Sequence, residues 1–194
     1  MIELSRLTNL SVMFSSGIDP CRLFQRLFLP ALISLELSVK TETLRTNHAE
    51  WQHVQTMLAH SCPPLRTLIL WYVPMTEGTL VGCLSNVPTL AELELQGMAC
   101  GDTILGALTM GEDAANGSKG LCPWLETIEF GYDGGLFEFS ERAMTRMVVS
   151  RWENANNTGF TGGRAVISIR GDCSYAFDGI RSNPDIAGCI QELG

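Results

Sequence analysis

The sequence lacks any long hydrophobic run. Its longest apolar stretches, such as LILWYV, are far shorter than the roughly 20 residues that a membrane helix needs. Glu3 and Arg6 interrupt the apolar start of the chain, which argues against a secretory peptide. We therefore expect no membrane segment, no membrane partner, and a cytoplasmic or nuclear location.

Paired cysteines and excess positive charge are also missing. The seven cysteines are an odd number and none has C-x-x-C spacing, so we expect free thiols rather than a disulfide framework. Lys and Arg number 13 against 21 Asp and Glu, which gives a net charge of −8. This balance argues against nucleic acid as a partner.

Catalytic and metal-binding patterns are absent as well. The chain has no G-x-S-x-G, P-loop or G-x-G-x-x-G motif. His48, His53, His60 and Cys62 lie close in sequence, but the spacing of His48 and His53 puts them on different sides of a helix. No cysteine nucleophile has an evident base. We predict that the protein is not an enzyme and has no catalytic residue, metal or other cofactor.

What the sequence does contain is a repeated L-x-x-L-x-L spacing. Copies begin at Leu7, Leu32, Leu65, Leu90 and Leu125, and a degenerate sixth begins at Arg164. The last two apolar residues of each copy are two apart, so they share one face of a short strand. One unit cannot bury this face alone, whereas stacked units form a continuous core, as in leucine-rich repeats.

The predicted architecture alternates strands and helices. We expect a right-handed α/β leucine-rich repeat solenoid with about six parallel strands on its concave face and helices outside. The predicted strands lie near residues 9–12, 34–37, 67–70, 92–95, 127–130 and 166–169. The predicted helices are 20–28, 48–60, 76–87 (with Thr76 as cap), 102–110 and 140–152, and a short one follows Pro184. Polar, glycine-rich loops are predicted at 111–120 and 153–164.

These motifs resemble a known group of proteins. The repeats, the lead-ins LPAL (29–32) and VPTL (87–90) and the SRW triplet (150–152) are similar to the leucine-rich-repeat region of fungal (basidiomycete-type) F-box proteins. The resemblance covers essentially the whole chain. It implies a substrate-recruiting arm of a ubiquitin ligase, in which a separate F-box binds the adaptor of the cullin complex.

The sequence departs from that pattern in three ways. No F-box is recognisable, so a ligase adaptor is expected as a partner only if an F-box lies elsewhere in the full protein. The chain begins almost on a strand, without a polar capping unit. Residues 1–194 are thus expected to be a single repeat domain, either a fragment of a longer chain that carries the F-box or cap, or an unusual isoform. The repeated asparagine of many leucine-rich repeats is replaced by Ser15, Lys40, Val73, Met98 and Asp133.

The predicted site lies between the leucines, because alternate strand residues face away from the core. We expect an acidic cluster beside an apolar anchor on the concave face. Its predicted residues are Glu36, Ile69, Trp71, Glu92, Glu94 and Glu129. A solvated polar sheet face remains the alternative interpretation of these charges, and burial under a loop the alternative for Trp71.

The predicted function is protein–protein recognition of a basic or mixed basic–apolar segment. Two alternatives stay open at this point. One is an interaction scaffold without a ubiquitin link, and the other is a hydrolase with its site in the insertions, which a preorganised Cys–His pair in a cleft would support.

Overall fold

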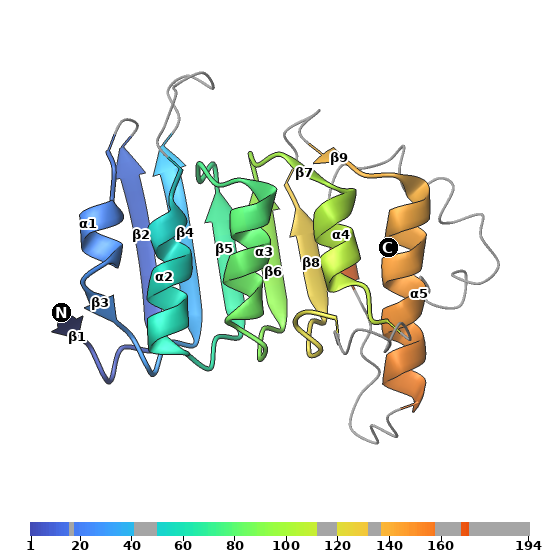
Figure 1. The fold of residues 1–194 in the computed structure, drawn as a ribbon, viewed down its shortest axis with the longest axis horizontal. Coiled ribbons are helices and arrows are strands. Elements are labelled where there is room, and N and C mark those ends of the chain that lie inside the picture. The colour runs from blue at the N-terminus through green and yellow to red at the C-terminus, as the bar shows by residue number, and fades with distance from the viewer. Residues whose placement is uncertain (16–17, 41–49, 112–119, 132–136, 158–167, 171–194) are drawn as a thin grey trace.

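The computed structural model describes residues 1–15, 18–40, 50–111, 120–131, 137–157 and 168–170. Its main feature is a six-stranded parallel sheet in which the strands follow one another in chain order (Figure 1). The strands are β2 (Asn9–Ser15), β4 (Ser34–Lys40), β5 (Thr67–Trp71), β6 (Glu92–Gln96), β8 (Thr127–Phe130) and β10 (Ser168–Arg170). All six predicted strands and their parallel pairing are confirmed.

The apolar spacing explains why these segments pair as they do. Leu35, Leu68, Leu93 and Ile128 lie in one register row, and Leu37, Leu70, Leu95 and Phe130 lie in the next. Every one of these side chains is at most 1% exposed. A shift of one residue would move each set to the opposite face, so the apolar pattern fixes the register.

The leucine that opens each of the four central motifs lies two residues before its strand. Leu32, Leu65, Leu90 and Leu125 are buried. At each step a single carbonyl then accepts two backbone amides from the next unit. Ile33 O accepts from the amides of Arg66 and Thr67, and Arg66 O accepts from those of Ala91 and Glu92. The same backbone connection is therefore repeated along the sheet.

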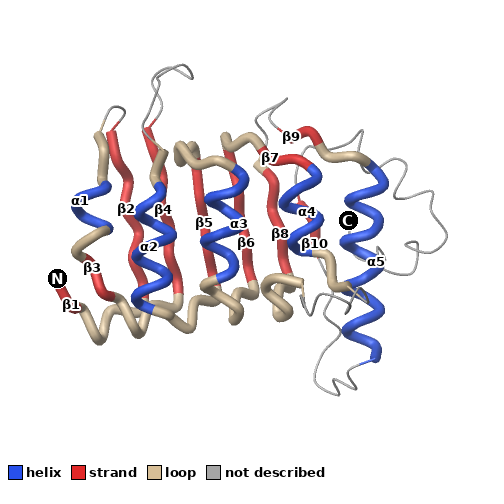
Figure 2. The backbone as a smooth tube through the Cα atoms, in the orientation of Figure 1, coloured by secondary structure: helices blue, strands red, loops and turns tan. Residues whose placement is uncertain are grey.

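The described helices lie on one face of the sheet (Figures 1 and 2). Each contacts its neighbour in chain order, and their apolar sides pack onto the leucines. The helices are α1 (Cys21–Phe24), α2 (Gln52–Ser61), α3 (Glu77–Ser85), α4 (Asp102–Leu108) and α5 (Glu141–Asn157). None of them covers the other face, which we call the open face.

Two predictions of local structure are wrong. The segment predicted as helix 20–28 forms one turn, α1, and then strand β3 (Leu27–Phe28), which pairs with β1 (Ile2–Glu3). Burial of Phe24 and Leu27 selects this arrangement, because it turns both side chains into the core. The predicted loop 153–164 begins too early, since α5 runs to Asn157.

The structure also contains a short parallel pair of strands that the pattern did not indicate. The two strands are β7 (Cys100–Gly101) and β9 (Phe137–Glu138).

Some predicted elements cannot be compared in full. The helix after Pro184 and most of the 111–120 loop lie outside the described residues, as do the start of the 48–60 helix and the rest of the 153–164 loop.

Carboxylates connect the beginnings of consecutive helices. Glu50, just before α2, accepts hydrogen bonds from the hydroxyls of Thr76, at 2.5 Å, and Thr79. Thr76 accepts in turn from the Thr79 amide at 3.3 Å, which confirms it as the cap of α3. Such a cap satisfies an amide that has no partner within the helix.

The same device recurs at the next two steps. Glu77, the first residue of α3, accepts from the amides of Gly101, at 2.9 Å, and Ile104, at 2.7 Å, at the start of α4. Asp102, the first residue of α4, accepts from the Ser140 amide at 2.7 Å and its hydroxyl at 2.6 Å, just before α5. We call Glu50, Glu77 and Asp102 the carboxylate ladder, because each anchors the start of the following helix.

The turns after β5 and β6 show what occupies the position of the missing asparagine. Tyr72 and Gly97 both adopt positive φ, at 58° and 67°. The next residues, Val73 and Met98, then enter the core and are each 2% exposed. Apolar burial thus closes these two turns.

A buried arginine attaches α5 to the rest of the molecule. The guanidinium of Arg151 donates to the carbonyls of Leu108 at 2.8 Å, Leu121 at 2.6 Å and Cys122 at 3.0 Å. Its side chain is 4% exposed, and burial lowers its pKa to about 10. The single guanidinium therefore provides hydrogen-bond donors for three backbone carbonyls, one at the end of α4 and two in the loop that follows it.

Candidate functional site

The open face carries the residues that alternate with the buried leucines. In register across the sheet, Glu36 lies beside Ile69, Ile69 beside Glu94, and Glu94 beside Glu129. Two residues further along the strands, Ser38 lies beside Trp71 and Trp71 beside Gln96. The parallel pairing therefore brings side chains from four separate units into two adjacent rows.

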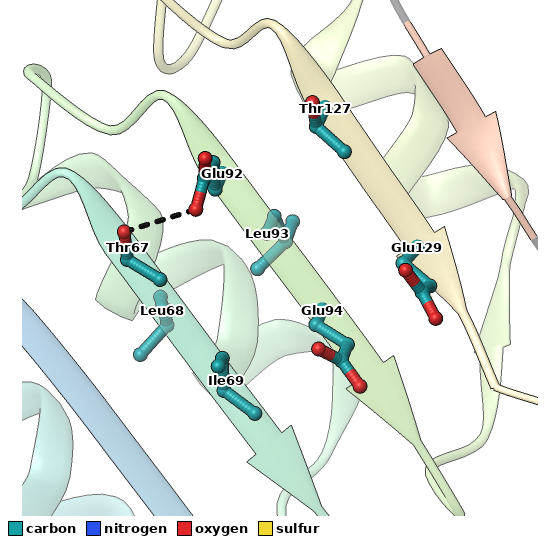
Figure 3. A pocket seen from close by; sticks show the side chains of 8 residues that line it. All are labelled: Thr67, Leu68, Ile69, Glu92, Leu93, Glu94, Thr127 and Glu129. Carbon is teal, nitrogen blue, oxygen red and sulfur yellow. Dashed lines mark hydrogen bonds between the residues drawn. The ribbon is translucent and has the colours of Figure 1, made fainter.

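A hollow of about 190 Å³ lies on this face over β5, β6 and β8. Figure 3 shows the side chains of Ile69, Glu94 and Glu129 at one end of it. At the other end are Thr67, Glu92 and Thr127, and Leu68 and Leu93 lie between the two ends. The hollow combines three carboxylates with two threonines and one isoleucine.

Trp71 borders this hollow and is held by one of its carboxylates. The indole N–H donates to Glu94 Oε1 at 2.7 Å. Ser38, its register neighbour, is only 4% exposed although it lies on the open face. Trp71 is itself partly buried.

Glu92 is held less firmly. Its Oε2 accepts a hydrogen bond of 3.2 Å from the hydroxyl of Thr67 on the neighbouring strand, and the side chain is exposed. Glu94 and Glu129 lie side by side on adjacent strands (Figure 3). Like charges in this position repel each other. Arg170 on β10 pairs in register with Glu129.

All six residues predicted from the sequence lie on the open face. Glu92, Glu94, Glu129 and Ile69 line the hollow, and Trp71 is joined to it by its hydrogen bond to Glu94. Ile69 separates Glu36 from the other carboxylates. Sequence reasoning missed the role of Thr67 and Thr127 as lining residues. Their position was visible in the alternation, because both begin their strands on the open side.

No metal centre is found in the part of the chain that the structure describes. There, no three His, Cys, Asp or Glu side chains lie close enough to share an ion. His53 forms a hydrogen bond with Gln25, and His60 lies exposed in the last turn of α2. His48 lies outside the described residues.

The described cysteines are all free thiols, namely Cys21, Cys62, Cys83, Cys100 and Cys122. Burial raises the pKa of Cys83, Cys100 and Cys122 to about 12. These three thiols are therefore protonated at neutral pH and suit packing rather than nucleophilic chemistry. Cys173 and Cys189 lie outside the described residues.

None of the described helices is both long and apolar enough to cross a bilayer. Comparisons of the chain with protein families, with curated proteins and with solved structures find no match.

Proposed function

We propose that this chain is a right-handed leucine-rich repeat solenoid whose open face binds a protein segment with adjacent basic and apolar side chains. The observation that carries the proposal is the hydrogen bond from Trp71 to Glu94 at the edge of the hollow. It places a large aromatic surface directly beside carboxylates, so one site offers an apolar contact and a counter-charge together.

The chemistry of the site favours a cationic side chain flanked by apolar ones. A lysine or arginine in the hollow would donate hydrogen bonds to the carboxylates that line it. Tryptophan is among the residues that most often dominate binding energy at interfaces. Ile69 and Trp71 would contact the apolar neighbours of that cation.

Support for the repeat architecture comes from the stacked leucine rows and the backbone connection that recurs at each step. The link to ubiquitin transfer rests on the resemblance of the repeats to those of fungal F-box proteins. In that setting the open face would hold the substrate, and an F-box elsewhere in the full protein would recruit the ligase.

A peptide selection tests the binding proposal even though the natural partner is unidentified. A random peptide library is displayed against the immobilised chain, and the enriched sequences are compared with those selected by Glu94→Lys. We expect peptides with Lys or Arg next to aliphatic or aromatic residues, and their loss with Glu94→Lys.

The matched control is Glu153→Lys, which makes the same charge change on α5, on the helix side of the sheet. It should retain the selected peptides. Selection of acidic or uncharged peptides, or equal retention by the two variants, would show that the open face is not the binding site.

A further inference from the structure

In the part of the chain that the structure describes, the outer edge of the sheet's first strand is unpaired. β2 ends the strand order and pairs only with β4 among the described strands. Thr8 O accepts from the amides of Ile33 and Ser34 on the β4 side. Because backbone groups alternate in direction along a strand, the N–H and C=O groups of Asn9, Ser11, Met13 and Ser15 point outward.

This edge lacks the features that normally prevent strands from pairing between molecules. Its sequence, NLSVMFS, contains no charged residue, no proline and no glycine. At seven residues, β2 is as long as β4 and longer than the remaining strands of the sheet. Natural edge strands are usually short, or carry lysine, proline or a bulge, so a long uncharged edge favours pairing with another strand.

Exposed apolar side chains gather around the same end of the molecule. Among the residues that the structure describes, nine large hydrophobic side chains are exposed, and six of them lie within the first 23 positions. These six are Met1, Ile2, Leu4, Met13, Ile18 and Leu23. Met13, on β2 itself, is 66% exposed. A cluster of this kind is typical of a protein interface.

We propose that two copies of this chain associate by antiparallel pairing of their β2 strands about a two-fold axis at Val12. In this register Ser11 of one copy lies opposite Met13 of the other, and Asn9 lies opposite Ser15. These are the residues whose backbone groups point outward, so each pair can exchange both hydrogen bonds. Leu10 lies opposite Phe14, which keeps the core-side residues together.

Charge complementarity favours a second copy as the occupant. The two-fold axis brings the end of β2 in one copy to the beginning of β2 in the other. Asp19 follows β2 by four residues and Arg6 precedes it by three, so the pairing brings an acidic and a basic residue to the same end of the paired strands, and it does so twice. The Cys21 side chain and amide hold the pKa of Asp19 below its ordinary value, so the carboxylate stays charged. Pairing of this kind is self-complementary and closes at two copies.

The proposed interface is the outer edge of β2, whereas the hollow lies over β5, β6 and β8, so this inference does not depend on the proposed function. Sedimentation equilibrium tests the proposed dimer, with the 194-residue chain measured over a roughly hundredfold range of concentration. We expect a concentration-dependent shift from 21.2 kDa to twice that mass. A monomer throughout, or open-ended growth beyond two copies, would overturn the proposal.

Two variants that differ at one position identify the interface. Ser11→Lys with Met13→Lys places ammonium groups opposite each other in both symmetric pairs, and should weaken the dimer about tenfold or more. Ser11→Asp with Met13→Lys places carboxylate opposite ammonium and should retain it. The two lysines of the first variant also make the net charge of −8 less negative. If overall charge repulsion between copies were all that limited association, this variant would therefore dimerise more strongly than wild type. Circular dichroism checks that both variants stay folded, and equal dimerisation of the two would refute β2 pairing.

Discussion

The ring of Tyr72 lies against Gly97 in the next unit. A Cβ at Gly97 would lie 2.6 Å from Tyr72 Cε1, closer than real Cβ atoms approach other atoms. The Tyr72 amide also donates to Gln96 O at 2.7 Å, and Gln96 Nε2 lies 3.1 Å from the Tyr72 hydroxyl oxygen. The side chain of one turn therefore packs on the backbone of the next. Glycine is needed at position 97 because its φ is 67° and because a Cβ there would overlap the Tyr72 ring.

Gly97→Ala should destabilise the protein by about 2 kcal/mol or more, because the left-handed conformation alone costs about 1–2 kcal/mol for a residue with a Cβ. Gly106→Ala is the matched control. Gly106 lies in α4 with no atom near its missing Cβ, so alanine there should stabilise by about 0.5–1 kcal/mol. Urea titration measures both changes, and equal signs would contradict the stacked turn.

Leu93→Ala should cost about 2–5 kcal/mol, the usual range for a leucine removed from a packed core. Leu93 is 1% exposed and lies between Leu68 and Ile128 in the sheet. Leu23→Ala, at a side chain that is 41% exposed, should change stability by no more than about 0.5 kcal/mol. A loss under about 1 kcal/mol at Leu93 in denaturant titration would place it outside a packed core.

Arg151→Met should lower stability by about 3 kcal/mol, since it leaves two buried carbonyls and one partly buried carbonyl without their donor. Methionine keeps most of the volume, so the loss reports hydrogen bonds rather than a cavity. Arg142→Met, on the exposed side of the same helix, serves as the control and should be nearly neutral. If thermal unfolding shows the two variants to be alike, Arg151 does not hold α5 in place.

The carboxylate ladder predicts a sensitivity to acid. Hydrogen bonds from Thr76 and Thr79 lower the pKa of Glu50 from 4.5 to about 2. A lowered pKa in the folded state stabilises the protein fully above the unfolded pKa, and this contribution is lost as pH falls through the folded pKa. The stability difference between wild type and Glu50→Gln should thus be constant above about pH 5 and shrink between about pH 4.5 and pH 2.

Unfolding titrations at several pH values measure this difference. Thr79→Val removes one of the donors, so the same comparison made in that background should show a smaller pH dependence. A difference that stays unchanged down to about pH 2 would show that Glu50 does not accept these hydrogen bonds in its charged form.

The open face predicts distinct kinetic effects for Trp71 and Glu94 on a selected peptide. Trp71→Ala should cost about 2 kcal/mol or more, mainly through faster dissociation. Glu94→Lys should lower the association rate and weaken its salt dependence. Because the two side chains share a hydrogen bond, the double variant should lose less than the sum of the single changes. Surface plasmon resonance at two salt concentrations measures all three, and additive losses would mean that the pair does not act together.

The sequence alone determined the sheet and the face on which the candidate site lies. The L-x-x-L-x-L spacing is a local signal, because alternation within each strand decides which residues face the core. Leu35, Leu68 and Leu93 could therefore be placed in one row, and Ile69, Glu94 and Glu129 in another, without coordinates. The helix over 20–28 failed because local periodicity cannot show that Leu27 must extend to pair with Ile2.

Only the tertiary structure decided how the units are joined. Glu77 reaches the start of α4, and Arg151 reaches carbonyls that precede it by 29 to 43 residues. Trp71 reaches Glu94 on the neighbouring strand. Each of these contacts depends on the rotamer and position of a side chain after the units have stacked. Alternation within one strand predicts the face of a residue, whereas the partner it finds there is set by the packing of its neighbours.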